Sequence, residues 1–150
     1  MSKAEAIGEF LGQKTLALVG VSRGGKKFGN SVLKDLAGKG YRVFPVHPSA
    51  EMIGGVRCWP DLKSLPEPVG GVVVVVPPEQ TERVVRDAHE AGIRRVWMQP
   101  GAESAEAVRF CEERGMRVVE GECILMFAEP VRSIHGLHRG LWRLLGRLPR

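Results

Sequence analysis

A glycine-rich segment, "ALVGVSRGGKKFGNSV" at residues 17–32, contains the residue types best suited to binding chemistry. Its apolar first part ends at Gly20, and glycines mixed with cationic side chains follow before an amphipathic segment opens near Ser31. Glycines let backbone amides approach a phosphate closely, and the positive end of a helix dipole favours the same anion. The segment therefore predicts a phosphate-binding loop at the entrance to a helix.

A P-loop of the kind found in nucleotide hydrolases is one interpretation of this segment. The spacing fits from Gly20 to Lys26, but Lys27 stands where a hydroxyl should hold magnesium. An ammonium group cannot ligate a cation. An ATP- or GTP-dependent enzyme therefore stays only as an alternative.

A dinucleotide-binding fingerprint is a second interpretation. Gly20 and Gly25 fit it, whereas Ser22 replaces the middle glycine and brings a hydroxyl donor instead. The second predicted strand should end in a carboxylate for the ribose hydroxyls, and it ends in Val-His-Pro at residues 46–48. An NAD-dependent enzyme or a redox sensor of Rossmann type also stays as an alternative.

A ligand with several phosphates, a purine and no need for a ribose-binding acid fits better. The loop offers backbone amides, the Ser22 hydroxyl and the cations Arg23, Lys26 and Lys27. Three cations suit a polyphosphate with an extra 3′-phosphate, as in coenzyme A. The alternative is that each of these cations is a solvated loop charge without a role in binding.

Alternating apolar patterns predict the scaffold that positions this loop. β-Branched runs predict strands at residues 15–19, 42–46, 71–76, 95–98 and 117–119, and helical spacing separates most of them. Five consecutive valines at residues 72–76 indicate a central parallel strand covered on both faces. We expect an α/β, Rossmann-like, doubly wound fold with a mainly parallel five-stranded sheet and helices on both faces.

Ligands of such sheets bind outside the carboxyl ends of the strands. The relevant loops are residues 20–30, 47–50, 77–79, 99–101 and 120–123. A short extended piece near residues 53–58 and a helix near residues 7–11, packed on the sheet edge, complete the expected elements.

Charge divides the chain into two predicted parts, a domain at residues 1–130 and a basic amphipathic helical tail at residues 131–150. The formal net charge is +5, and the tail holds five arginines and no acid, so the domain is neutral overall. We expect the tail to pack on its own domain, on a second subunit or on a partner protein; the alternative is that it lies on an anionic membrane or on nucleic acid. The neutral domain gives no reason to expect nucleic acid or a membrane as a partner.

Composition and cysteine usage indicate a soluble cytoplasmic protein. No apolar run approaches the roughly 20 residues that span a bilayer, and no signal-peptide core is evident at the start. Cys58, Cys111 and Cys123 have neither disulfide-framework nor zinc spacing, so we expect reduced thiols and no metal. Many arginines and few polar amides are compatible with a thermostable protein.

Several longer stretches, in order, resemble the CoA-binding domain family. They are "LVGVSRGGKKFGNSVLKDLAGKGYRVFPVHP", "IGGVRCWPDLKSLP", the valine run ending in "VPP", "EAGIRRVWMQPGAES" and "GMRVVEGECI". The chain is similar, over residues 7–130, both to small stand-alone bacterial proteins and to the amino-terminal domain of the succinyl-CoA synthetase α subunit.

The resemblance implies a role for each loop. Gly20, Ser22 and neighbouring amides would hold the CoA phosphates. Val46 and Pro48 would border the adenosine. Val76, Pro77 and Pro78 would lie beneath the adenosine or beside the pantetheine. Gln99 and Gly101 would line the way to the thiol. The other candidate cofactor-binding residues are Val21, Arg23, Lys26, Lys27, Asn30 and His47.

Two departures from the family limit what the resemblance implies. The family usually has asparagine where this chain has His47. The synthetases also pass phosphate through a histidine on a later domain, and this chain ends before such a domain. We therefore expect CoA or acyl-CoA binding without ligase chemistry and with no catalytic residues. Cys123 is expected to be a small buried cysteine near the functional edge; the alternative is a mixed disulfide with the CoA thiol.

Overall fold

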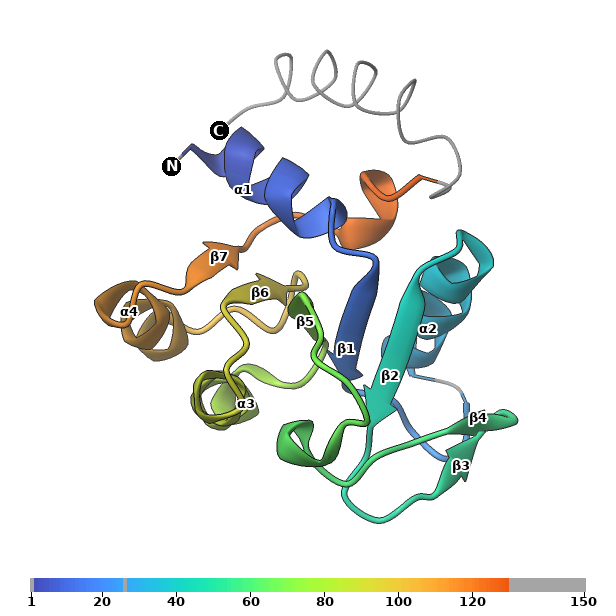
Figure 1. The fold of residues 1–150 in the computed structure, drawn as a ribbon. Helices are drawn as coiled ribbons and strands as arrows, with labels where there is room; N and C mark the ends of the chain where they lie inside the picture. Colours follow the sequence, from blue (N-terminus) through green and yellow to red (C-terminus); the bar gives the residue numbers. More distant parts are fainter. Residues whose placement is uncertain (1, 26, 130–150) are drawn as a thin grey trace.

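The computed structural model describes residues 2–25 and 27–129, which form a three-layer α/β fold (Figure 1). Its sheet contains five parallel strands in the order β2-β1-β5-β6-β7. The strands are β1 (Thr15–Val19), β2 (Arg42–Val46), β5 (Gly71–Val74), β6 (Arg95–Met98) and β7 (Arg117–Val119). The predicted fold class is confirmed.

Helices cover both faces of the sheet, as Figure 1 shows for α2 on one side and α3 and α4 on the other. The first face packs against α1 (Lys3–Leu11) and α2 (Phe28–Gly38), with Leu16, Leu18 and Trp97 in its core. The second packs against α3 (Pro78–Glu90) and α4 (Ala105–Glu113). Ser104 caps α4 by accepting a hydrogen bond from the amide of Ala107.

Strand β5 lies at the centre of the sheet, between β1 and β6, and all four of its residues are buried. It ends at Val74 rather than at residue 76, because the chain turns there toward α3. The amide of Val75 still donates to the carbonyl of Val19, and Val76 is already half-buried. The valine run therefore predicts the buried strand but not the point at which it leaves the sheet.

Helix α1 packs directly on the sheet because Gly71 has no side chain. A methyl group at Gly71 would overlap the ring of Phe10, which in turn meets Trp97 edge-on with ring centroids 5.4 Å apart. Trp97 is fully buried, and its indole N–H donates to the carbonyl of Glu122. The N-terminal helix is thus part of the core.

Strand β2 forms one edge of the sheet, and Trp59 pairs with its outer side. The amide of Trp59 donates to the carbonyl of Pro45, and the amide of His47 donates to the carbonyl of Trp59. The Trp59 ring also meets Phe44 edge-on at 5.1 Å. Proline in a sheet is confined to such edge positions, because it has no amide to donate.

Short elements connect these layers. A two-stranded hairpin, β3 (Met52–Ile53) and β4 (Val56–Arg57), follows β2, and single helical turns occur at η1 (Leu62–Ser64) and η2 (Ile124–Met126). The part of the chain that the structure describes contains no helix long and apolar enough to cross a bilayer. The predicted tail at residues 131–150 lies outside the described residues.

Candidate functional site

The strand order locates the site. Strands β1 and β5 are neighbours, and the chain runs to β2 on one side and to β6 and β7 on the other, so the connections diverge between β1 and β5. A ligand crevice forms at such a switch point, outside the carboxyl ends of the strands. The loops after β1, β2 and β5, which hold most of the predicted site residues, meet there (Figure 1).

Three backbone segments are in close contact at this point, because two of them contain glycine. Gly20 has φ +132°, a conformation that side-chain-bearing residues avoid, and a methyl group there would overlap the carbonyl of Val75. A methyl group at Gly29 would overlap the carbonyl of Gly20. The first turn of α2 therefore sits against the end of β1.

Sequence reasoning assigned the third glycine of the dinucleotide-like pattern to Gly25 and missed Gly29. Gly25 is exposed, has open space around its Cα and forms the turn of the loop, where its amide donates to the carbonyl of Ser22. Helix α2 begins at Phe28, three residues earlier than the amphipathic pattern indicates. A glycine next to a predicted helix start was the available signal for Gly29.

Asn30 holds the loop in shape through Ser22. Its Oδ1 accepts from the amide of Ser22 at 2.9 Å and from the Ser22 hydroxyl at 3.3 Å, while its Nδ2 donates to the Ser22 carbonyl at 3.0 Å. The amide and the hydroxyl of Ser22 therefore both donate to Asn30. Ser22 and Asn30 therefore fix the shape of the loop from within.

The amino end of α2 lies next to Ser22 and Asn30 and has no side-chain cap from its N-cap residue. Lys27 is the N-cap residue but makes no side-chain cap, so the first amides of the helix, those of Phe28 and Gly29, have no partner from it. The Lys27 side chain is exposed, and the helix dipole adds positive potential at the same point. Lys26, the other predicted cation, lies outside the described residues.

Arg23 ties the loop after β1 to the loop after β2. Its Nη2 donates to the carbonyl and the hydroxyl of Ser49, both at 3.0 Å. A guanidinium has five donors in all. Arg23 therefore keeps Nε and Nη1 donors that are not used on Ser49.

His47 organises the loop after β2. Its Nδ1 accepts from the amides of Ser49 at 3.1 Å and Ala50 at 3.0 Å. An asparagine Oδ1 stabilises turns by the same pattern, so the His47 ring acts here as an asparagine side chain can. A cavity of about 500 Å³ opens beside the loop, lined by residues 47–52 and 57–60.

The remaining residues near the switch point are apolar. Val46 is buried at the end of β2 and Pro48 is exposed just beyond it. Val76 is half-buried, and the exposed Pro77 and Pro78 begin α3. They form a surface with few hydrogen-bonding groups between the cationic loops and β6.

Gln99 and Gly101 lie farther along the same edge, after β6. Gln99 is fully buried, with its Oε1 accepting from the amide of Ile124 at 2.7 Å and its Nε2 donating to the Cys123 sulfur at 3.4 Å. The amide of Gly101 donates to the Glu103 carboxylate at 2.7 Å. Both amide atoms of Gln99 are therefore used in hydrogen bonds inside the protein, whereas Gly101 is exposed.

Charge is distributed unevenly along this edge. Arg23 and Lys27 lie on the β1 and β2 side together with one acid, Glu51, whereas Glu103, Glu120 and Glu122 lie on the β6 and β7 side. Only Glu122 of these acids has a cationic partner, Lys3 at 3.1 Å, among the described residues. A ligand with phosphates at one end and an uncharged arm at the other fits this polarity.

The three cysteines are free; Cys58 and Cys111 are buried, whereas Cys123, predicted to be buried, is half-buried. Burial raises the pKa of Cys58, and burial together with the nearby Glu112 carboxylate raises the pKa of Cys111 to about 12. Neither is a thiolate at neutral pH. Among the described residues, no group of three metal-ligating side chains comes together.

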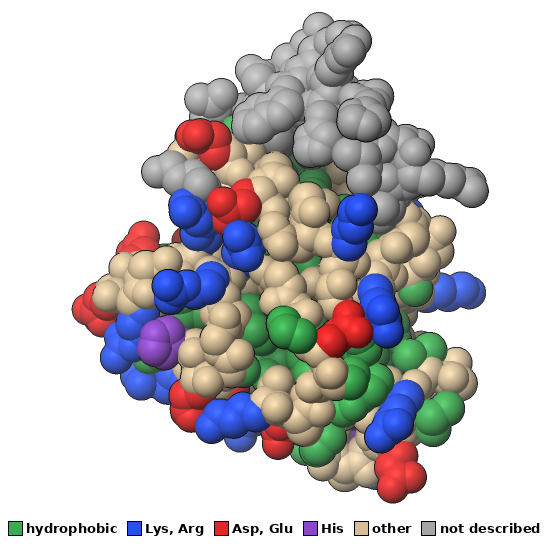
Figure 2. All heavy atoms as spheres, in the orientation of Figure 1, with side chains coloured by type: hydrophobic (Ala, Val, Ile, Leu, Met, Phe, Trp, Pro, Cys, Tyr) green, Lys and Arg blue, Asp and Glu red, His purple; other side chains and the backbone are tan. Residues whose placement is uncertain are grey.

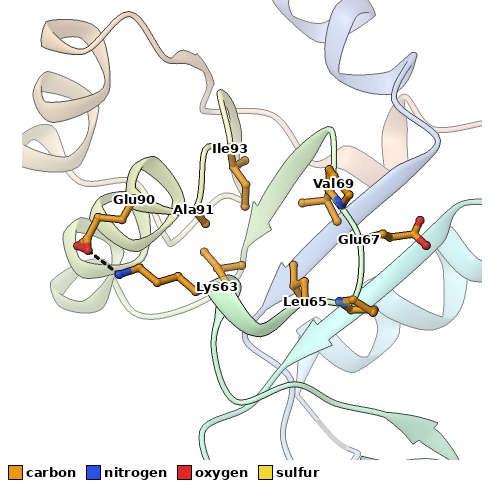
Figure 3. A pocket seen from close by; sticks show the side chains of 10 residues that line it. Lys63, Leu65, Glu67, Val69, Glu90, Ala91 and Ile93 are labelled. Atoms are coloured by element: carbon orange, nitrogen blue, oxygen red, sulfur yellow. Dashed lines mark hydrogen bonds and ion pairs between the residues drawn. The ribbon is translucent and has the colours of Figure 1, made fainter.

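A second cavity, of about 450 Å³, lies at the amino ends of β5 and β6, away from the switch point. Figure 3 shows Lys63 and Glu90 paired at one side of it, and Leu65, Val69 and Ile93 among its apolar lining. Figure 2 shows hydrophobic side chains gathered in the middle and lower part of this face, with charged ones around them. This second cavity is lined by none of the predicted site residues.

Comparison with known proteins agrees with this geometry. A family model described as a CoA binding domain matches residues 14–129. The chain belongs to this CoA-binding domain family. The match includes every loop at the switch point, and the resemblance inferred from the sequence is confirmed.

Members of the CoA-binding domain family occur both alone and within larger enzymes. An uncharacterized protein of Bacillus subtilis, YneT, is 30% identical over 82% of this chain and 91% of its own length. The α subunit of an ADP-forming acetate–CoA ligase II from Pyrococcus furiosus is 26% identical over 77% of this chain, which spans only 28% of that subunit. A solved conserved hypothetical protein from Pyrococcus furiosus is 43% identical over 75% of this chain and 97% of its own, with a TM-score of 0.71.

Proposed function

We propose that this chain binds coenzyme A or an acyl-CoA through the glycine-rich loop after β1, and that it performs no ligase chemistry of its own. The observation that carries the proposal is the placement of the uncapped amino end of α2 at the switch point, within the region that matches the CoA-binding domain. Family membership does not favour the NAD- or nucleotide-dependent enzymes that the loop sequence left open.

The polarity of the edge supports one direction of binding. The phosphates lie against the amides of Phe28 and Gly29, near Arg23 and Lys27. The pantetheine arm crosses the apolar surface at residues 76–78, and the thiol lies toward Gly101. Acidic side chains near that end disfavour placing the phosphates there.

The absence of chemistry in this proposal follows from the chain's own side chains. The switch point brings together amides, cations and prolines, and no nucleophile with an adjacent base is found there among the described residues. We expect the protein to serve as a carrier, a sensor or a subunit for a partner. The reduced thiols fit a cytoplasmic location.

Calorimetric titration with CoA, 3′-dephospho-CoA, NAD and ATP tests the proposal. We expect CoA to bind most tightly and 3′-dephospho-CoA more weakly. Lys27→Ala should weaken CoA binding about tenfold, the loss of one charge-assisted contact of roughly 1.4 kcal/mol. Lys14→Ala is the matched control, because Lys14 is an exposed lysine at the opposite end of β1. Tight binding of NAD or ATP without CoA would overturn the proposal.

A further inference from the structure

The loops after β1 and β2 are joined by a chain of hydrogen bonds that ends on one imidazole nitrogen. Arg23 donates to Ser49, and the amides of Ser49 and Ala50 donate to Nδ1 of His47. Two N–H groups thus point at a single acceptor. Nδ1 must be unprotonated to receive them, which places the proton of the neutral ring on Nε2.

We propose that His47 is a positioning residue that holds Arg23 in place for the ligand's phosphates only while its Nδ1 is unprotonated. The inference rests on the proposed function for the identity of the ligand, but the hydrogen-bond chain itself belongs to the ligand-free protein. Protonation turns Nδ1 into a donor facing two other donors. The turn at residues 48–50 then loses its acceptor, and Ser49 no longer presents its carbonyl and hydroxyl to Arg23.

The charged groups around His47 come from the loop after β1 and from the cavity beside the ring. The charged and titratable groups around it are Arg23 from the loop after β1, and Glu51, Arg57 and Cys58 along the adjoining cavity. The Arg57 guanidinium lies over the Trp59 ring, 5.2 Å from its centroid. Within the residues that the structure describes, no carboxylate accepts a hydrogen bond from His47.

Acidification has two opposite effects on CoA affinity. A charged imidazole near the phosphates would strengthen binding through electrostatic attraction. Losing the turn releases the Arg23 side chain, which is exposed and regains its rotational freedom. We expect the second effect to dominate, so CoA affinity falls on acidification. The loss of affinity should be about tenfold between measurements at about pH 7.5 and about pH 5.5.

His47→Asn is the decisive variant. Asparagine offers an Oδ1 acceptor to the same amides but does not titrate, so it should retain the affinity of the natural chain at pH 7.5 and lose the pH dependence. His47→Leu removes the acceptor and should bind weakly at both pH values. Arg23→Ala should also bind weakly and show no further loss on acidification, because the residue that His47 positions is gone.

The experiment combines nitrogen NMR of the ligand-free protein with CoA titrations at the two pH values. The long-range 15N spectrum should show an unprotonated Nδ1 for His47 at pH 7.5, identified by the signal that His47→Asn lacks. A ring protonated on Nδ1 at pH 7.5, an affinity that rises on acidification, or the same pH profile in His47→Asn would each overturn the inference. If neither the natural chain nor any variant binds CoA, although the NMR tautomer is the expected one, the proposed function is overturned instead.

Discussion

At the scale of single residues, Gly29 is the position at which the smallest change has the largest expected effect. In Gly29→Ala the added methyl group overlaps the carbonyl of Gly20, so the first turn of α2 must move away from β1. We expect a destabilisation of about 1–3 kcal/mol, typical of overpacking, and a loss of CoA affinity. Urea unfolding and calorimetry measure the two effects.

Gly38→Ala is the matched control for that substitution. Gly38 is at the last position of the same helix, with open space around its Cα. Alanine there should be neutral or stabilise the protein by up to about 1 kcal/mol. Equal effects of the two substitutions would contradict the contact between α2 and β1.

Tyr41 gives a stability prediction that depends on pH. Its hydroxyl donates to the carbonyl of Leu11 at 2.9 Å, and burial, with the Glu129 carboxylate adding to it, raises the pKa of Tyr41 from 10.0 to about 12. The folded state therefore holds the proton more tightly than the unfolded state. This contribution to stability is complete below about pH 10 and is lost as the pH rises through about 12.

Tyr41→Phe removes that titration. At pH 8 the variant should be less stable, because the Leu11 carbonyl loses its donor. Between about pH 10 and 12 the difference in the free energy of unfolding between the two chains should become smaller, since only the natural chain loses the tyrosine contribution. Urea unfolding at several pH values measures it, and a difference that stays constant would contradict the assignment. Cys58 and Cys111 are common to both chains and cancel in the difference.

The residue types of the site could be read from the sequence, but their partners could not. The glycines, cations and prolines stand at strand ends that β-branched runs indicate plainly, so the candidate loops follow from pattern alone. That Ser22 is committed to Asn30, and that the His47 ring replaces an amide oxygen, depends on side-chain directions in loops. No periodicity encodes such directions. Which of these residues touch the cofactor stays a prediction.

At the scale of elements, the packing of α1 on the sheet depends on two residues far apart in the sequence. Gly71→Ala places a methyl group against the Phe10 ring and should destabilise the protein by about 1–3 kcal/mol. Phe10→Leu alone leaves a gap beside Trp97 and is also destabilising. The double variant should be more stable than the sum of the two predicts, because leucine makes room for the methyl group.

A thermodynamic cycle of the four proteins measures this coupling. Additive effects would mean that α1 is not seated on β5 as described. Circular dichroism at the tryptophan band offers an independent readout, since Phe10 meets the Trp97 ring.

The strands could be predicted more accurately than their arrangement. Four of the five have the predicted bounds, whereas β5 ends two residues early, where the close approach of Gly20 and Val75 decides the exit of the chain. The sequence pattern predicts the start of α2 too late in the chain, because the N-cap is a lysine rather than a residue that caps with its side chain. The order of the strands depends on which helix covers which face, and a single sequence does not specify this.

At the scale of the whole molecule, we expect the CoA-binding domain to function without the basic tail. The family match ends at residue 129, and all loops of the switch point precede it. Removing residues 131–150 lowers the formal net charge from +5 to zero, because the segment contains five arginines and no acid. The truncated chain should keep its CoA affinity within about twofold, as no contributor to the proposed site is lost.

Light scattering and calorimetry of the truncated chain check this expectation. A fall in molecular mass with unchanged affinity would assign the tail to subunit contact. Loss of CoA binding in a folded truncated chain would contradict the confinement of the site to the domain. Lower retention on an anionic resin at low salt is expected from the charge alone.

The pairing of Trp59 with the outer side of β2 also affects how copies of this protein meet. An open strand edge invites a strand from another molecule, and sheets that grow in this way lead to aggregates. At this edge Pro45 has no amide to offer, and both the Pro45 carbonyl and the His47 amide are already bonded to Trp59. Growth of the sheet past β2 is therefore blocked by the chain itself, which leaves side-chain surfaces, rather than shared backbone hydrogen bonds, as the means of self-association on this side.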